Sequence, residues 1–317
     1  MKLSRLYELV VKYGIAQDPR GVKISEYFKD IEKKRRKLKG IERQCFDGEA
    51  LRNPFADTRI LNGSPDTEVR KILMGIDIET PEILLADRLR DRQGLDLVVS
   101  HHPEGVAYAG MAEVMNVQGF ILQKLGVHRE AVESFLKERM QEVDRRLSPA
   151  NHSRPVDAAR LLDVPFMSIH TPADNCVAGC LQKTIDESRP KKVSDVLRAL
   201  YRFPEYKDAL KDKAGPKIIL GSPEKKCGKV FVDMTGGTEG PKELFGRISQ
   251  VGVGTIVCMH LSEEHFTRIK PEHINVIIAG HIASDNIGLN LLFDKIEAHE
   301  KLEISCCSGF KRIRRAR

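Results

Sequence analysis

The stretch that decides the fold lies at residues 274–285, which read Ile-Asn-Val-Ile-Ile-Ala-Gly-His-Ile-Ala-Ser-Asp. It is an apolar strand that runs directly into the pattern His-x-x-x-Asp. Residues 164–174 repeat this design as Val-Pro-Phe-Met-Ser-Ile-His-Thr-Pro-Ala-Asp. Ligands of open α/β sheets usually bind where the strands end. Both segments therefore predict an α/β fold with a chemical site at the ends of its strands.

A third apolar strand ends in histidines. Residues 95–100 read Leu-Asp-Leu-Val-Val-Ser and run into His101-His102-Pro103. Two adjacent histidines on a strand would point to opposite faces, but at a strand end the backbone turns, so both can reach one cluster. Neutral imidazole is a common metal ligand. By itself the pair also fits two hydrogen-bonding loop histidines.

The elements around these strands occur twice in the same order. An apolar strand at 72–78 precedes a helix that Pro81 opens and Gly94 ends, and a strand at 229–233 precedes a Gly-rich turn and a helix at 244–248. A strand at 255–259 then leads to His260. This order predicts an α/β protein of two similar halves, with sheets flanked by helices. The first helix is expected to bury an apolar face that contains Ile83, Leu84, Leu85 and Leu89.

Three further segments lie outside the repeat. Residues 1–68 carry leucines at helical spacing and are predicted to be a helical extension, in which Ser25 caps a second helix. Residues 69–310 form the two-lobed α/β domain, interrupted by a helical insertion at about 111–163. Residues 311–317 are a basic tail. We expect the tail and the basic run at 33–37 to be solvated, although such runs can also bind nucleic acid.

The composition is that of an ordinary soluble globular protein. The 317 residues carry a net charge of +7, of which the tail supplies a large part, so the body of the protein is nearly balanced. No apolar run approaches the roughly 20 residues of a membrane span, and the charged N-terminal residues do not resemble a signal peptide. The seven cysteines are scattered. We therefore expect reduced thiols and a cytoplasmic location.

Five nitrogen and oxygen ligands suggest two metal ions. The candidates are His101, His102, Asp174, His281 and Asp285. Five ligands are too many for a closed tetrahedral zinc site, whereas a carboxylate can bridge two ions about 3.5–4 Å apart. We expect two divalent ions, which would be zinc, manganese or iron. The alternative is that the histidines bond within loops and the aspartates cap helices.

These motifs, in this order over about residues 70–310, resemble the NIF-three-like family, whose members are also labelled GTP cyclohydrolase I type 2 homologues. The resemblance implies two similar α/β halves, a dinuclear metal centre with the same five ligands, and ring-shaped hexamers. This chain would be a divergent member with an N-terminal extension and a helical insertion. It departs from the family at Asp285, where Glu is usual, and at Glu104, where an apolar residue is usual.

The preferred functional hypothesis is a metal-dependent hydrolase acting on a nucleotide, another phosphate ester or a purine ring. Glu104, His170, His260 and His265 are the candidates for proton transfer. The turn at 236–240 could hold a phosphate or be a plain turn. The alternative function is a non-catalytic metal-binding or scaffold protein that forms a ring-shaped oligomer. A small-molecule substrate and self-association are the expected partners, while nucleic acid and membrane are not expected.

Overall fold

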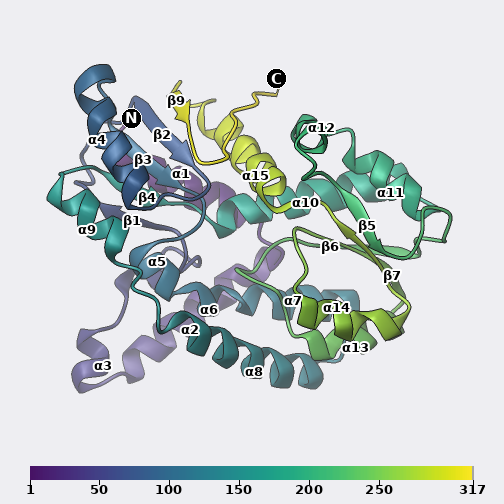
Figure 1. The fold of residues 1–317 in the computed structure, drawn as a ribbon. Helices are drawn as coiled ribbons and strands as arrows, with labels where there is room; N and C mark the ends of the chain where they lie inside the picture. The colour runs from purple at the N-terminus through teal and green to yellow at the C-terminus, as the bar shows by residue number, and fades with distance from the viewer. Residues whose placement is uncertain (316–317) are drawn as a thin grey trace.

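The computed structural model describes residues 1–315 and contains two β-sheets with helices on both faces (Figure 1). The first sheet has the order β1-β4-β3-β2-β9 and the second β5-β8-β7-β6. The strands are β1 (Arg59–Asn62), β2 (Lys71–Gly75), β3 (Leu97–Ser100), β4 (Phe166–Ser168), β5 (Lys217–Leu220), β6 (Lys229–Asp233), β7 (Val253–Cys258), β8 (Asn275–Ile278) and β9 (Glu303–Cys306). The predicted fold class is confirmed.

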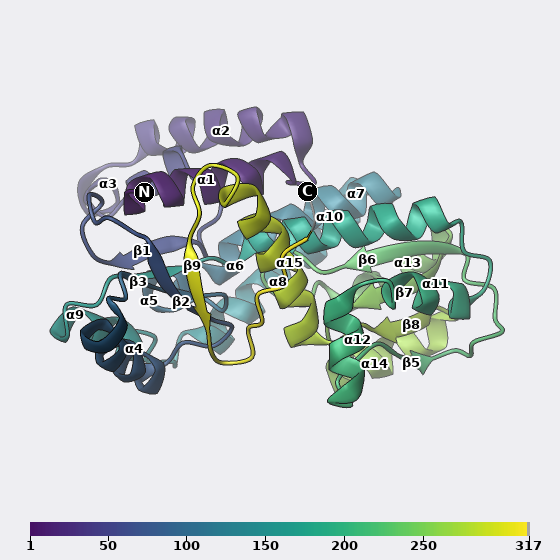
Figure 2. The same ribbon diagram turned by 90° about the horizontal axis from the view of Figure 1, so that it is seen from above.

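Helices make up the rest of the framework (Figure 2). They are α1 (Leu3–Ala16), α2 (Ile24–Lys37), α3 (Gly40–Gln44), α4 (Thr80–Gln93), α5 (Gly105–Ala109), α6 (Met111–Val114), α7 (Asn116–Leu125), α8 (Arg129–Leu147), α9 (Arg154–Leu161), α10 (Thr171–Ser188), α11 (Val193–Leu200), α12 (Pro204–Lys211), α13 (Phe245–Gln250), α14 (Glu263–Ile269) and α15 (His281–Ile296). Within residues 1–315, none of them combines the length and apolar character that crossing a membrane requires.

The two halves share one topology. In each sheet three strands that follow one another in the chain run parallel, β2-β3-β4 and β6-β7-β8, and an antiparallel strand pairs with the third, as β1 does with β4 and β5 with β8. The first sheet has a fourth parallel strand, β9, which pairs with β2. Both antiparallel pairs slip register at the same place, between Ile60 and Asn62 and between Ile218 and Leu220. The repeat therefore begins at β1, inside the segment expected to be a helical extension.

Helices α10 and α15 form the layer between the two halves (Figure 2). Ala173 and Leu289 belong to the core of the first sheet, whereas Val177 and Ile287 belong to that of the second. At Gly288 an added Cβ would lie 2.5 Å from the carbonyl oxygen of Ala173, so only glycine permits this close approach. Because each helix starts directly after a strand, the packing of α10 against α15 brings the two His-x-x-x-Asp segments together.

The first sheet is covered on both faces. Ile72 and Met74 pack with α1, α10 and α15, while the intervening Leu73 packs with α4 and α9. Burial on both faces explains why the strand is a continuous apolar run. Helix α4 buries Ile83 and is capped by left-handed Gly94, as predicted. Leu84 and Leu85 are 52% and 45% exposed, so their assignment to the buried face is wrong.

The N-terminal segment divides into a buried and an exposed part. Helix α1 buries its leucines in the first core, while α2, which carries the basic run, buries no side chain. Helix α2 begins at Ile24 with Lys23 in the capping position, so the prediction that Ser25 caps it is wrong.

Helices α5 to α9 connect β3 to β4, and α7 and α8 among them pack against the other half of the molecule. Leu122 of α7 and Val132 of α8 pack with Phe231 and Ile256 of the second sheet. The helices α13 and α14 complete this outer layer (Figure 1). The connection between β3 and β4 of the first half thus covers one face of the second sheet.

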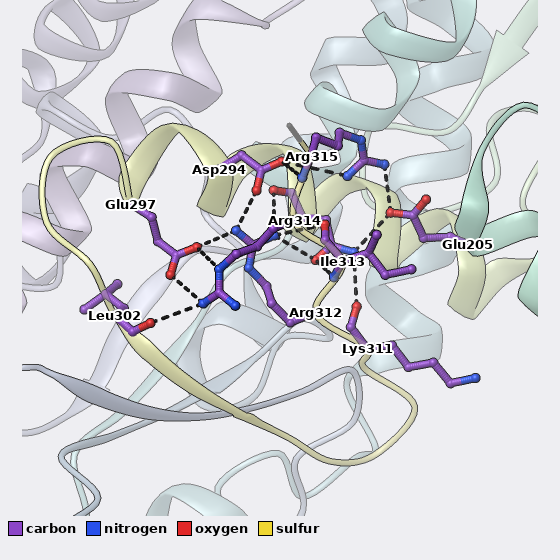
Figure 3. Close-up of polar contacts among 10 residues, drawn as sticks. Glu205, Asp294, Glu297, Leu302, Lys311, Arg312, Ile313, Arg314 and Arg315 are labelled. Atoms are coloured by element: carbon purple, nitrogen blue, oxygen red, sulfur yellow. Dashed lines mark hydrogen bonds and ion pairs between the residues drawn. The ribbon is translucent and has the colours of Figure 1, made fainter. Parts of the chain in front are cut away.

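The basic tail, expected to be solvated, is bound to the protein (Figure 3). The Arg312 guanidinium contacts Asp294 at 2.6 Å and Glu297 at 2.5 Å, and only 4% of its side chain is exposed. Arg314 also pairs with Glu297, and Arg315 pairs with the buried Glu205 of α12 at 2.7 Å. The expectation of a solvated tail is therefore wrong for Arg312 and Arg315, because each pairs with carboxylates that are largely buried, whereas the side chains of Lys311 and Arg314 are exposed. Residues 316–317 lie outside the described part.

Candidate metal centre

The strand ends of the first sheet and the starts of α10 and α15 meet at one place. His101 and His102 follow β3, and His170 follows β4. Asp174 lies in the first turn of α10, and Asp285 lies one turn into α15. The parallel order of β3 and β4 puts their ends at the same edge of the sheet. The metal ligands expected from the sequence therefore lie together.

Two overlapping groups have the composition of metal sites. One consists of His101, His170 and Asp174, and the other of His101, His102 and Asp285, with the ligand atoms of each group within 4.8 Å of one another. The Nε2 atom of His101 lies 3.4 Å from both carboxylates. His101 thus links the two groups.

The first group brings in a residue that the sequence placed elsewhere. The Nε2 of His170 lies 3.7 Å from Oδ2 of Asp174, and its ring centroid lies 4.9 Å from that of His101. His170, expected to transfer protons, stands among the ligand-type residues instead. These groups could hold a metal ion.

Asp285 is the centre of the second group. Its side chain is fully buried, and Oδ2 lies 3.5 Å from Nε2 of His102 and 3.7 Å from Nε2 of His281. The rings of His102 and His281 have centroids 5.0 Å apart. The shorter carboxylate that replaces the family's usual glutamate therefore still reaches three imidazoles.

Three histidines are held by their Nδ1 atoms. Nδ1 of His101 lies 3.0 Å from the carbonyl oxygen of Ile169, that of His102 lies 2.6 Å from Asp77, and that of His170 lies 2.8 Å from Asp57. Since a carbonyl oxygen can only accept, the His101 Nδ1–H donates. Such bonds orient metal-binding imidazoles and leave Nε2 for the ion.

Among residues 1–315, the atoms that face the middle of the cluster have no hydrogen-bond partner. The buried and unpaired atoms include Nε2 of His101 and His102, Oδ1 of Asp174 and both carboxylate oxygens of Asp285. Buried polar atoms are almost always hydrogen-bonded, and leaving one unpaired costs about 1–3 kcal/mol. A cation in this position would satisfy all five atoms, so the residues fit a metal.

The pKa shifts show that the cluster favours positive charge on or beside its histidines. Burial lowers the pKa of His101, but Asp285 and Asp174 outweigh burial and raise the pKa to about 10. Burial would raise the pKa of Asp285, yet the surrounding histidines hold it well below its usual range. In contrast, burial and the neighbouring histidines lower the pKa of His281 to about 4, which leaves a neutral imidazole. The buried carboxylates thus draw positive charge to the cluster.

The other expected proton-transfer residues occupy three different places. His260 is half-exposed, and its ring centroid lies 4.8 Å from that of His281. His265 is buried, with Nε2–H donating to the Gly240 carbonyl at 2.8 Å and Nδ1 accepting from Ser262 at 2.7 Å. Glu104 lines a separate cavity, and burial with the nearby Glu79 and Asp77 raises its pKa to about 7.

Sequence reasoning missed the two carboxylates that orient the histidines. Asp77 follows β2 directly, so its position at a strand end was a usable signal. Asp57 is fully buried and also accepts from Thr171 at 2.5 Å. It comes from the loop before β1, where no apolar run or spacing marks it.

The fold and the cluster together define a two-lobed α/β protein with a metal-type site where its halves meet. No family model and no curated protein matches the chain. Among solved structures, it is similar to a NIF3 superfamily protein from Sphaerobacter thermophilus, with 28% identity, a TM-score of 0.72, and coverage of 90% of this chain and 98% of that one. Reduced HcgD from Methanocaldococcus jannaschii aligns at 15% identity with a TM-score of 0.45, covering 80% and 93% of the two chains. A Bacillus cereus protein related to NIF3 aligns at 10% identity with a TM-score of 0.42, covering 82% and 92%.

The chain is a NIF3-like protein, as its motifs indicated.

Proposed function

We propose that this protein is a dinuclear divalent-metal hydrolase that acts on a nucleotide, another phosphate ester or a purine ring. The observation that supports the proposal is the set of five buried, unpaired ligand atoms at the centre of the histidine cluster. His101, His170 and Asp174 would hold one ion, and His102, His281 and Asp285 the other. Zinc, manganese and iron are all compatible with nitrogen and oxygen ligands.

Divalent ions supply Lewis acidity and bring the pKa of water toward neutrality. The side chains of the protein would orient the metal-binding histidines and transfer protons. Asp57 and Asp77 fix the rings of His170 and His102. His260 lies beside the cluster with a half-exposed ring, which suits proton exchange between substrate and solvent. We therefore assign proton transfer to His260 in preference to His265, whose ring nitrogens are both engaged.

The experiment that tests the proposal measures metal content and turnover on the same protein samples. The protein is loaded with manganese, zinc or iron, analysed for metal, and assayed on nucleotides, a generic phosphodiester and purines. We expect two ions per chain. Asp285→Asn should reduce the metal content to one ion or fewer and abolish turnover, whereas Asp91→Asn, on the exposed face of α4, should change neither. A wild-type content well below one ion would contradict the metal assignment.

The alternative function is a metal-binding scaffold without catalysis. It predicts the same metal content but no turnover on any substrate class. Loss of turnover in step with loss of metal would exclude it, whereas full metal occupancy with no turnover would favour it.

We further propose self-association, with a hexamer as the state that the family resemblance implies. The supporting observation is that Leu84 and Leu85 of α4 and Leu161 of α9 are 52%, 45% and 74% exposed on helices that pack together. Exposed apolar patches commonly mark interfaces. Light scattering should give an oligomer, and Leu161→Glu should weaken it. A monomeric wild type would contradict this proposal.

A further inference from the structure

A cavity of about 90 Å³ extends from the metal-type cluster into the second half. Its inner end is formed by His170, Asp174 and His281, and its far end by apolar side chains that include Phe231 and Phe245. This is several times the space that one buried water requires. The cavity thus offers apolar walls beside the candidate metals.

Away from the metal-type cluster, the cavity is lined by the carboxylates of Asp233 and Glu239 and by the amide of Gln118. The carboxylate of Asp233, at the end of β6, has no hydrogen bond or ion pair within residues 1–315. Glu239 accepts from the backbone N–H of Ser262 at 2.6 Å, and its Oε2 lies 3.4 Å from Nδ1 of His265. No lysine or arginine of the described chain lines the cavity. Burial and the nearby Glu239 raise the pKa of Asp233 to about 6.

A third acceptor comes from the connection between β3 and β4. Gln118 of α7 lines the cavity and is 4% exposed, and its Oε1 has no partner in the described part of the chain. Its Nε2 donates to the carbonyl oxygens of Gly236 and Thr238 at 3.1 and 2.5 Å. The amide orientation is therefore fixed by two acceptors, which leaves the oxygen for a donor.

The turn that carries Glu239 is held rigidly by the same helices. Gly236 has φ +100°, and an added Cβ would lie 2.6 Å from Cγ of Gln118. The Nε of Arg139 in α8 donates to the carbonyl oxygen of Glu239 at 3.1 Å. The carbonyls of the turn are thus engaged by the protein, and its carboxylate is preorganised at the cavity.

We propose that this cavity binds the non-reacting part of the substrate, a planar nitrogen heterocycle whose N–H groups donate to Asp233, Glu239 and Gln118. The inference rests on the proposed function and narrows its substrate class. Amidine- or guanidine-like N–H pairs match carboxylates in geometry and charge. Beside Asp233 and Glu239 a phosphate would meet two carboxylates and no lysine or arginine of the described chain, and an unpaired buried charge is costly. Any phosphate of the substrate must therefore lie away from these two carboxylates.

Binding of 2-aminobenzimidazole to the metal-loaded protein, measured by calorimetry, tests the inference. It is a planar ring with guanidine-like N–H donors. We expect it to bind, and 2-methylbenzimidazole, which lacks the amino donor, to bind more weakly. Asp233→Asn and Glu239→Gln should each weaken binding at least about tenfold, because charge-assisted hydrogen bonds are roughly twice as strong as neutral ones. Glu263→Gln, an exposed position on α14, is the matched control and should bind as the wild type does.

Three results would overturn the inference. They are no binding of 2-aminobenzimidazole to folded, metal-loaded protein, equal binding of 2-methylbenzimidazole, and equal affinity of all three variants. Glu239→Gln retains an amide oxygen for the Ser262 N–H, and melting temperatures verify that each variant is folded. Turnover is measured on the same samples. Ring binding without turnover supports the cavity and rejects the hydrolase, whereas turnover without ring binding rejects the cavity alone.

Discussion

Replacing Arg312 by alanine should destabilise the protein although the residue lies in its basic C-terminal tail. The guanidinium donates to Asp294 and Glu297 at 2.6 and 2.5 Å, and its side chain is 4% exposed (Figure 3). The tail thus closes over the end of α15. Removing Arg312 would leave two carboxylates facing each other without their shared cation.

The size of the effect follows from burial. Breaking a buried ion pair by removing one partner costs about 3–5 kcal/mol. The loss here should lie at or just below the lower end of this range, because the side chain of Asp294 is 23% exposed and Arg314 continues to pair with Glu297. We expect a loss of about 2–3 kcal/mol in the free energy of unfolding, and at about 2 °C per kcal/mol for a chain of this size a fall in Tm of about 4–6 °C.

Urea denaturation followed by circular dichroism gives the comparison. Lys311→Ala is the control, because its ammonium is exposed and its ion pairs measure 3.6 Å, so a change within about 0.5 kcal/mol is expected. Arg312→Lys should recover only part of the loss, since an ammonium cannot bond both carboxylates in fork geometry. If Arg312→Ala unfolds at the same urea concentration as Lys311→Ala, the tail is a solvated segment and the reasoning fails.

The other predictions concern the metal-type cluster and the turn beside it. Asp174→Ala should remove more metal than His260→Ala in elemental analysis, because Asp174 offers a direct ligand; equal losses would reject this ranking. Asp57→Asn should weaken metal affinity by about 10–100-fold in competition with a chelator, and an unchanged affinity would show that the His170 ring needs no such support. Gln118→Ala should accelerate hydrogen exchange of the amides at 236–240 at unchanged metal content, since the turn loses two hydrogen bonds; unaltered exchange would contradict its holding role.

The metal-type cluster could be predicted from the sequence because each ligand is marked locally. An apolar run followed by His101 indicates that a strand ends there and that a candidate ligand follows it. The same pattern at His170 marked a residue of the cluster, although its expected role was proton transfer. Parallel strands β3 and β4 bring such ends to one edge, so linear patterns translate directly into proximity. The sequence also predicted that Asp174 and Asp285 lie one helical turn beyond a histidine, which is confirmed by α10 and α15.

What the sequence left open depends on distant partners. Asp57 hydrogen-bonds to His170, which is 113 positions away, and no sequence pattern around Asp57 predicts that contact. Arg315 pairs with Glu205, which is 110 positions away. Because the local run of basic residues does not indicate this partner, the sequence predicted a solvated tail. Strand β1 is a short Arg-Ile-Leu-Asn segment, and its pairing with β4 gives it its structure.

The internal repeat explains why the two halves contribute different chemistry to one site. Ser100 pairs with the ends of β2 and β4 as Cys258 pairs with those of β6 and β8. Met259 therefore stands where the first half has His101, so the second half lacks the histidine that links both metal-type groups. Asp233 correspondingly stands where the first half has Gly75, which gives the second half an unpaired carboxylate instead. The first half thus supplies most of the metal-type ligands. The equivalent strand ends of the second half line the cavity beside them.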